Sequence, residues 1–383
     1  MIYLDNAAST KPRKEVIEEM IRVMNNEYAN PDAIHEYAHK TLLNMKNQKE
    51  KMARLLGLNS KEIYFTAGGS DGNNIIIQGI VEANSRNKKH LITTKIEHSS
   101  VYEIFRNYEK EGYEVDYLDV SEYGEVDVEQ LERLIREDTI LVSIIAVNSE
   151  IGIIQDLEKI SKIIKNKNKE AYFHTDFVQG LGHTKVDFSK LEIDAITITS
   201  HKINGPKGIG AIYINKNVKI KEIMYGTNKE NGIIKRTLPT ELIFGFIKAI
   251  EMAYNNYEKE VKYIYELKKY FIEQLKKNID KIRINSLLEL EKSTPTILNV
   301  SFGGVKGEVL TSFLGMYEIY VSTGSACSSR RGNSRIIESL GVPNEQVEGA
   351  IRFSFSIDNT VEEVDIVIQK LIECVTQIRM MKY

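Results

Sequence analysis

Hydrophobic and polar positions follow a repeating order over the first 240 residues: short, almost wholly apolar runs alternate with amphipathic stretches. Apolar runs of this length predict buried strands, and the amphipathic stretches predict helices. The predicted strands are Ile63–Thr66, Leu91–Thr94, Val115–Leu118, Ile140–Val147, Ala171–His174, Ala195–Thr199 and Ile209–Ile214. The predicted helices include Asn73–Glu82, Val128–Ile135 and Leu157–Ile164. This order predicts an α/β fold with a mostly parallel sheet covered by helices on both faces.

The first residues predict a loop that leads into a helix. Ser9 or Thr10 can cap this helix, and Pro12 suits its first turn, where the missing N–H of proline costs nothing. Apolar side chains at helical spacing predict one buried face. They are Val16, Ile17, Met20, Ile21 and Met24.

After Pro239 the pattern changes to a long, highly charged helical stretch that runs to about Lys277. The remainder mixes strands and helices, which is typical of an α+β domain around an antiparallel sheet. Its predicted elements are the strands Thr296–Ser301, Ile319–Ser322 and Ile351–Phe355 and the helix Val361–Met380. We therefore expect a large domain over residues 16–250 and a small C-terminal domain over residues 251–383, with residues 1–15 packing on the small domain.

Composition narrows the function. Two cysteines, Cys327 and Cys374, are too few for a disulfide framework or a four-thiolate metal site, which indicates a reducing compartment and chemistry from a single thiol. The 51 basic and 54 acidic side chains leave a net charge of −3, so nothing favours nucleic acid or an anionic membrane. No apolar run reaches the ~20 residues of a membrane span, and no export signal is visible, so we expect a cytoplasmic protein.

Two motifs resemble known sites without the required context. His35–His39 reads His-Glu-Tyr-Ala-His, the spacing of a zinc protease helix, but it follows the turn-like pair Asn30-Pro31 and is expected at a helix start. Gly205–Gly210 is rich in glycine but leads into a strand rather than a helix, unlike a dinucleotide-binding turn. We therefore expect no metal site and no nucleotide site.

A third group of residues favours an aldehyde cofactor with a phosphate. The strand Ile63–Thr66 leads through small residues to Ser70 at a helix start, where free N–H groups can bind phosphate. Asp176 and Lys202 follow two other predicted strands, at the sheet edge where α/β proteins bind ligands. A lysine with a lowered pKa can form a Schiff base, and a carboxylate keeps a pyridine nitrogen protonated. His98 can stack on such a ring.

These residues belong to longer stretches that carry a family resemblance. The chain resembles the cysteine desulfurases of the class V aminotransferase group, which are pyridoxal-phosphate enzymes of fold type I. The resemblance covers nearly the whole chain and rests on Tyr3–Ala8, Asn30-Pro31 with Ile34-His35, Asn73-Asn74, Glu97-His98, Val147-Asn148 with Glu150–Gly152, His174–Asp176 with Gln179, Ser200–Gly210, Thr237–Pro239, Ser322 with Gly324–Cys327, and Ile351–Ser354.

The resemblance implies how the cofactor is held. Lys202 would bind pyridoxal phosphate covalently and then act as acid and base. Asp176 would pair with the pyridine nitrogen, Gln179 would bond the ring oxygen, and His98 would stack on the ring and assist proton transfer. The remaining cofactor-binding residues would be Gly69, Ser70, Ser149, Ser200 and His201, with Thr237 reaching the phosphate from a second subunit of a homodimer.

The resemblance also implies the reaction. Arg352 and Asn148 would bind the substrate L-cysteine, and Arg352 would bind its carboxylate. Cys327 would attack the substrate sulfur, which leaves L-alanine and a persulfide on the protein. The sulfur would pass to an acceptor protein such as a cluster scaffold, for iron–sulfur cluster assembly, or a tRNA-thiolation enzyme. The 25-residue spacing from Cys327 to Arg352 is typical of the long-loop branch of the family.

Three stretches depart from the family pattern. Residues 67–74 read Ala-Gly-Gly-Ser-Asp-Gly-Asn-Asn in place of Ser-Gly-Ala-Thr-Glu-Ala-Asn-Asn. Ser149 replaces the second asparagine of Asn-Asn-Glu, and Ile234–Thr237 replaces Arg-Ser-Gly-Thr. These departures leave three hypotheses open: a cysteine desulfurase, a selenocysteine lyase or other pyridoxal-phosphate C–S lyase that does not need Cys327, and a degenerate member that serves as a binding or scaffold protein.

Overall fold

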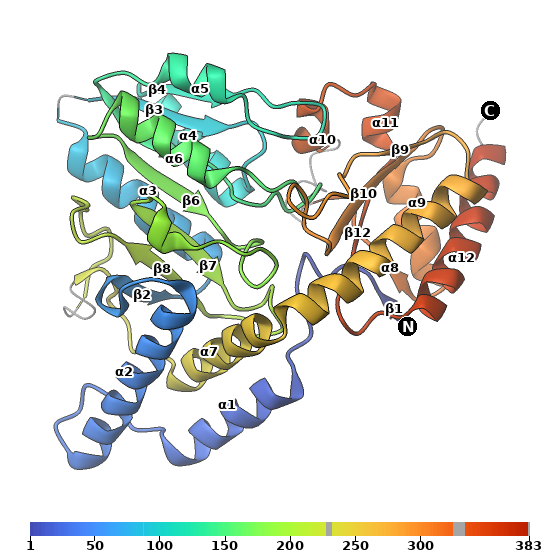
Figure 1. Cartoon of the computed structure of the whole chain (residues 1–383). Helices are drawn as coiled ribbons and strands as arrows, with labels where there is room; N and C mark the ends of the chain where they lie inside the picture. Colours follow the sequence, from blue (N-terminus) through green and yellow to red (C-terminus); the bar gives the residue numbers. More distant parts are fainter. Residues whose placement is uncertain (87, 227–231, 325–333, 382–383) are drawn as a thin grey trace.

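The computed structural model describes residues 1–86, 88–226, 232–324 and 334–381, and Figure 1 shows a large sheet as its main layer. Within these ranges the sheet has seven strands in the order β2-β8-β7-β6-β5-β3-β4. Strand β8 is antiparallel to β2 and β7, and the other neighbours are parallel. The strands are β2 Ile63–Thr66, β3 His90–Thr94, β4 Glu114–Leu118, β5 Thr139–Ser143, β6 Tyr172–Asp176, β7 Ala195–Thr199 and β8 Gly210–Ile214. The predicted, mostly parallel sheet is confirmed.

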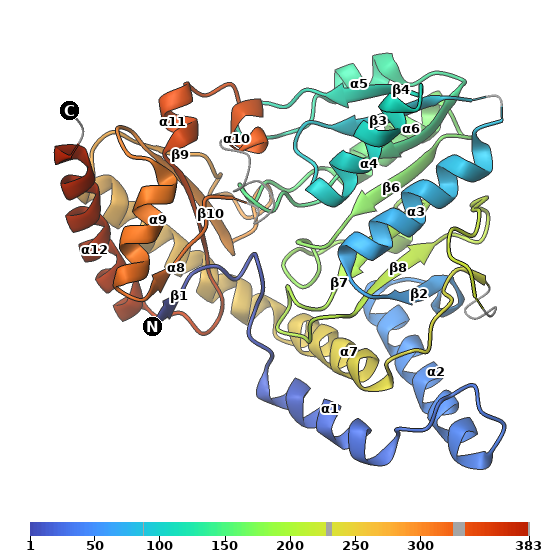
Figure 2. The same ribbon diagram turned by 180° about the vertical axis from the view of Figure 1, so that it is seen from behind.

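Helices cover both faces of this sheet. Helix α3 lies in front of one face of the sheet in Figure 2, and α6 lies in front of the other face in Figure 1. Adjacent strand residues face opposite cores: Tyr64 and Leu91 pack with α3 and α4, whereas Phe65 and Ile92 pack with α6 and α7. The helices of this part are α1 Lys14–Asn26, α2 Glu36–Leu56, α3 Gly69–Asn84, α4 Ser99–Lys110, α5 Val128–Leu134, α6 Leu157–Lys167 and α7 Thr240–Asn255, with 3-10 turns at Ser60–Glu62 and Phe188–Lys190.

A separate hydrophobic core forms around a smaller antiparallel sheet with the order β12-β10-β9. The chain start also reaches this core, because Ile2 and Leu4 are part of it and β1 pairs in parallel with β11. The elements are β1 Ile2–Tyr3, α8 Tyr257–Asn278, β9 Ile282–Ile284, β10 Ile297–Phe302, α9 Gly307–Met316, β11 Ile319–Tyr320, α10 Arg335–Ser339, α11 Asn344–Glu348, β12 Ala350–Ser354 and α12 Val361–Met380. The domain limits at residues 15 and 250 stay a prediction.

The N-terminal helix differs from its prediction in cap and in face. It begins at Lys14 with Arg13 as N-cap, and no side chain caps it. Thr10 instead donates to the carbonyl of His201 (2.9 Å), because the residues before the helix run along the Lys202 loop. The stripe that packs toward α7 consists of the buried Val16 and Val23 and the partly buried Met20, whereas Ile17, Ile21 and Met24 are exposed. The predicted cap and most of the predicted face are therefore wrong.

Three other segments refine the predictions. Strand β5 ends at Ser143 rather than Val147, because residues 144–147 leave the ladder with β3 and lead into the turn at 148–153. The long charged helix is two helices, α7 and α8, which are separated at Asn256. His35 is the N-cap of α2, and its Nδ1 accepts from the Ala38 N–H, as expected for a helix start. Among the described residues, no helix has the length and apolarity needed to cross a bilayer.

Candidate active site

The carboxyl ends of β6 and β7 and the N-terminus of α3 meet at a cavity of about 230 Å³. Such an edge is where α/β sheets bind ligands, since loops from several strands converge there. Residues predicted for the site that line this cavity are Gly69, Ser70, His98, Ser149, Asp176, Gln179, His201, Lys202 and Arg352. The sheet thus gathers side chains that lie far apart in the sequence into one cavity.

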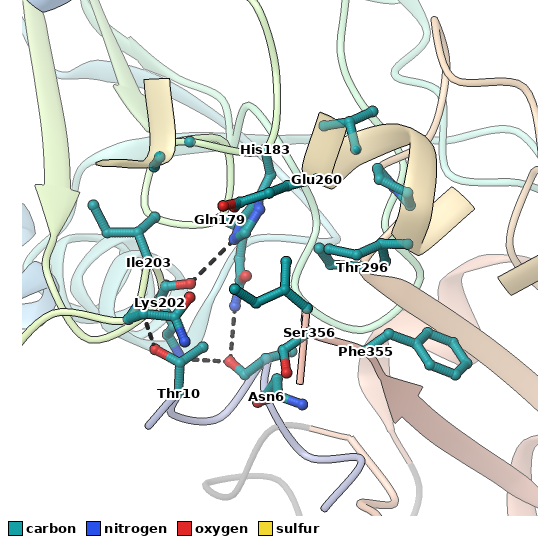
Figure 3. Close-up of a pocket in the computed structure, with 18 of the residues that line it drawn as sticks. Asn6, Thr10, Gln179, His183, Lys202, Ile203, Glu260, Thr296, Phe355 and Ser356 are labelled. Carbon is teal, nitrogen blue, oxygen red and sulfur yellow. Dashed lines mark hydrogen bonds between the residues drawn. The ribbon is translucent and has the colours of Figure 1, made fainter. Parts of the chain in front are cut away.

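Lys202 lies in the turn after β7 and is held from both sides. Its Nζ donates to the backbone carbonyls of Ala7 and Ala8, the latter at 2.8 Å. Behind it, His183 Nε2 lies 3.1 Å from the Lys202 carbonyl, next to a second cavity of about 30 Å³ (Figure 3). Burial, and then the charge of Arg352, lower the pKa of Lys202 to about 8. A substantial minority of the amine is therefore neutral at physiological pH.

Asp176 is the last residue of β6 and its carboxylate is fixed by two donors. Its Oδ1 accepts from the Val178 N–H (3.0 Å), and its Oδ2 accepts from Asn73 Nδ2 (2.8 Å). The same amide of Asn73 donates to Ser100 Oγ at 2.9 Å. The carboxylate is 3% exposed, so it is a buried and oriented acceptor on the cavity wall.

His98 is the N-cap of α4, and its cap contact fixes the ring. Nδ1 accepts from the Ser100 N–H (3.2 Å) and lies 2.8 Å from Ser100 Oγ. Burial lowers the pKa of His98, against the opposing charge of Asp176. The imidazole is thus a neutral group with Nδ1 engaged, which leaves Nε2 for proton transfer.

The N-terminus of α3 and the turn after β7 form an anion cradle. Gly68 has a φ of +152°, which favours glycine, and Gly69 and Ser70 open the helix toward the cavity. Ser200 Oγ and His201 Nδ1 are buried and have no hydrogen-bond partner in the described part of the chain. Burial, and then Lys202, lower the pKa of His201 to about 4. These free polar groups suit an anionic ligand such as a phosphate.

Arg352 comes from β12 of the smaller sheet and is 2% exposed. Nη1 donates to the Ser149 carbonyl (2.9 Å) and Nη2 to Asp5 Oδ1 (2.7 Å). Its Nε is buried without a hydrogen-bond acceptor among the described residues. The Nε–H of the guanidinium therefore stays available for a carboxylate ligand.

Several predicted site residues lie elsewhere. Asn148 does not line the cavity: its Nδ2 donates to the Ile96 carbonyl and its Oδ1 accepts from the N–H groups of the next turn. Ser200 is fully buried and does not line the cavity, and Thr237 is exposed and does not line it either. Cys327 lies outside the described residues.

Sequence reasoning missed four contributions to the site. They are the amide of Asn73, the cap residue Ser100, the carboxylate of Asp5, and the carbonyls of Ala7 and Ala8. The stretches Tyr3–Ala8 and Asn73-Asn74 did carry the resemblance, and this was the available signal. A backbone carbonyl leaves no signature of its own in a sequence.

The residues present fit pyridoxal phosphate. A lysine with a lowered pKa, a buried carboxylate and a cradle with unpaired polar groups surround one cavity of suitable size. A lysine after one parallel strand, an aspartate at the end of its neighbour and a second, smaller sheet that supplies an arginine define the fold and site of the fold-type I pyridoxal-phosphate enzymes.

The chain belongs to the aminotransferase class-V family, whose profile matches residues 2–367. The cysteine desulfurase IscS of Clostridium botulinum is 37% identical over 381 residues, which cover 99% of this chain and 96% of that protein. A solved NifS-like protein superposes with a TM-score of 0.92 at 35% identity, and the match covers 98% of this chain and 99% of that protein. The structure of SspA in complex with cysteine has a TM-score of 0.82 at 30% identity, and the match covers 93% of this chain and 99% of that protein.

Proposed function

We propose that this protein is a pyridoxal-phosphate-dependent cysteine desulfurase that converts L-cysteine to L-alanine and passes the sulfur to an acceptor protein for iron–sulfur cluster assembly. One observation carries the proposal: Lys202, Asp176 and Arg352 meet in a single cavity, in a chain that a curated cysteine desulfurase matches over 99% of its length. The alternative acceptor, a tRNA-thiolation enzyme, stays a prediction.

When bound, pyridoxal phosphate supplies an electron sink for charge that develops next to the substrate amino group. Lys202 would hold the cofactor covalently, because its lowered pKa leaves a reactive share of neutral amine at physiological pH. Asp176 would pair with the ring nitrogen, and Asn73 keeps the carboxylate in place for this task. Gln179 lines the cavity and already donates one amide hydrogen to the Ala7 carbonyl (2.9 Å), so the ring oxygen would be a second partner.

The phosphate would lie in the cradle at the start of α3. The residues that would hold it are Gly69, Ser70, Ser200 and His201. Ser200 Oγ has no partner in the described ranges and therefore keeps its hydrogen for the ligand. Gly205 packs against Ser200 so closely that a Cβ at residue 205 would lie 2.0 Å from Ser200 Oγ, which explains the glycine.

The substrate carboxylate would bind at Arg352, whose buried Nε is unpaired in the described structure. Lys202 would then remove the Cα proton, and neutral His98 would assist proton transfer through Nε2. The thiolate of Cys327 would attack the substrate sulfur, so that an S–S bond forms as the Cβ–S bond breaks. The electron pair of the broken bond would stay with Cβ, which takes a proton; alanine leaves, and the sulfur stays on Cys327 as a persulfide. The role of Cys327 rests on the resemblance.

The residues that flank the segment 325–333 support this role. Ser334 Oγ donates to Glu150 Oε2 at 2.5 Å, and a Cβ at Gly324 would lie 2.9 Å from the same oxygen. The two described residues next to this segment, Gly324 and Ser334, therefore both lie at one carboxylate, and Ser334 is bonded to it. Glu150 follows Ser149, which lines the cavity.

We also propose a homodimer in which Thr237 serves the cofactor site of the partner subunit. Thr237 is exposed in the single chain and does not line its own cavity. Helix α1 also presents an exposed apolar stripe: Ile17, Ile21 and Met24 are 43%, 52% and 51% exposed. Burial of such a stripe against a second copy would remove it from water.

The experiment that tests the function measures alanine and sulfide, or selenide, from cysteine and selenocysteine in parallel. The expected result is turnover of cysteine by the wild type and none by Lys202→Ala. Undiminished cysteine turnover by Cys327→Ala would favour a C–S lyase, and a preference for selenocysteine would favour a selenocysteine lyase. A colourless protein that releases no alanine would overturn the proposal in favour of a scaffold.

A further inference from the structure

Asp71 shapes the phosphate cradle but also brings a negative charge to it. Its Oδ2 accepts from the Ala67 N–H at 2.8 Å, and this bond closes the turn that precedes α3. Asp71 lies in the first turn of α3, directly after Ser70. A carboxylate at a helix N-terminus cancels part of the positive potential that otherwise attracts an anionic ligand.

Arg236 meets this carboxylate from a distant segment. Its Nη2 donates to Asp71 Oδ2, and the two side chains are 29% and 32% exposed. The residues before it are fixed as well: Ile234 is fully buried, and Lys235 forms an ion pair with Glu222 at 2.8 Å. The stretch that departs most from the family pattern is therefore packed and paired, and it delivers one cation to the start of α3.

We propose that Arg236 is a positioning residue for the phosphate site: it neutralises Asp71, so that the N-terminus of α3 keeps its attraction for a dianionic phosphate ester. Asp71 can then close the turn without repelling the ligand. This inference rests on the proposed function, because the ligand is the phosphate of pyridoxal phosphate. It explains why an arginine stands where the family pattern has glycine.

The test compares pyridoxal phosphate with pyridoxal, which lacks the phosphate, as ligands of the full-length apoprotein. In Arg236→Gln, the Kd for pyridoxal phosphate rises roughly tenfold, which corresponds to about 1.4 kcal/mol. The Kd for pyridoxal changes less than about twofold, because the uncompensated charge of Asp71 acts on the phosphate alone. Adding Asp71→Asn to Arg236→Gln restores most of the affinity, since it removes the unpaired charge.

Lys221→Gln is the matched control. Lys221 pairs with Glu82 at the other end of α3 (3.1 Å), so its loss leaves both affinities unchanged. Wild-type affinity for pyridoxal phosphate in Arg236→Gln, an equal loss for both ligands, or a double variant no better than Arg236→Gln would each overturn the inference. A wild type that binds neither ligand would instead overturn the proposed function.

Discussion

The pH at which the apoprotein captures pyridoxal phosphate reports how the cavity sets the charge of Lys202. A lysine attacks an aldehyde only as the neutral amine. Burial, and then Arg352, lower the pKa of Lys202 from 10.5 to about 8, against Asp5 and Asp176. At pH ~7.5 about one quarter of such amines are neutral, compared with about one in a thousand at a pKa of 10.5. The cavity thus raises the fraction of neutral amine at this pH roughly 200-fold.

Two substitutions in one ion pair shift this pKa in opposite directions. Arg352→Gln removes a cation and leaves the Asp5 carboxylate unpaired, so the pKa of Lys202 rises. Asp5→Asn removes an anion and leaves the guanidinium, so the pKa falls. With an effective dielectric constant near 20, one charge about 10 Å away shifts a pKa by roughly one unit, and a nearer charge shifts it more.

The assay mixes apoprotein with excess pyridoxal phosphate between pH ~6.5 and ~10.5 and follows the yellow absorbance of the bound cofactor in a stopped-flow instrument. The capture rate of the wild type is expected to have its midpoint near pH 8, with Asp5→Asn below it and Arg352→Gln above it. Arg283→Gln, which breaks a distant pair with Glu122, is the control. A wild-type midpoint near 10.5, or a shift of both variants in the same direction, would refute the reasoning.

Three further predictions concern stability and cofactor affinity. Burial lowers the pKa of Lys268 to about 7, so the unfolded chain binds more protons than the folded chain between pH ~7 and 10.5. The free energy of unfolding therefore rises with pH across this window. Urea unfolding of Lys268→Met should lack that rise. Asn73→Ala removes a donor to the Asp176 carboxylate and should raise the Kd for pyridoxal phosphate tenfold or more in a fluorescence titration, since such bonds contribute about 1.5–3 kcal/mol. Gly72→Ala restores the family residue but places a methyl group 2.7 Å from a β8 side chain. In thermal denaturation it should lower the free energy of unfolding by about 1–3 kcal/mol. The control Gly315→Ala places its methyl group in open space and should not change the free energy of unfolding. The first prediction would be contradicted by a wild-type unfolding free energy that does not depend on pH. The second would be contradicted by an unchanged Kd of Asn73→Ala, and the third by an unchanged melting temperature of Gly72→Ala.

Local patterns predicted most of the fold because the strands are short, apolar and bounded by turns. Strands β2 and β7 and helix α12 have the predicted limits. The prediction for the N-terminal helix failed because a tertiary contact decides where the helix starts. Thr10 donates to the carbonyl of His201 and therefore does not cap the helix. Its buried face also depends on where α7 lies, since a Cβ at Gly245 would lie 2.7 Å from Met20 Cγ.

The cavity residues were predictable as chemical types but not as contacts. Strand ends and side-chain chemistry indicated Lys202 and Asp176, and the resemblance added Arg352; all three line one cavity. The resemblance gave no indication that Asp5 pairs with Arg352, because these residues are 347 positions apart. Likewise, the departures at 234–236 looked like lost function, whereas Arg236 has a partner in α3. Such pairings depend on tertiary geometry, which local periodicity does not specify.

The most direct test of the central claim is mass spectrometry of the holoprotein after a single turnover with L-cysteine and no acceptor or reductant. We expect one added sulfur atom on the peptide that carries Cys327, in amounts equal to the alanine released, and no such addition in Lys202→Ala or on the peptide that carries Cys374. Alanine release without added sulfur on Cys327, or equal alanine release by Cys327→Ser, would contradict the claim.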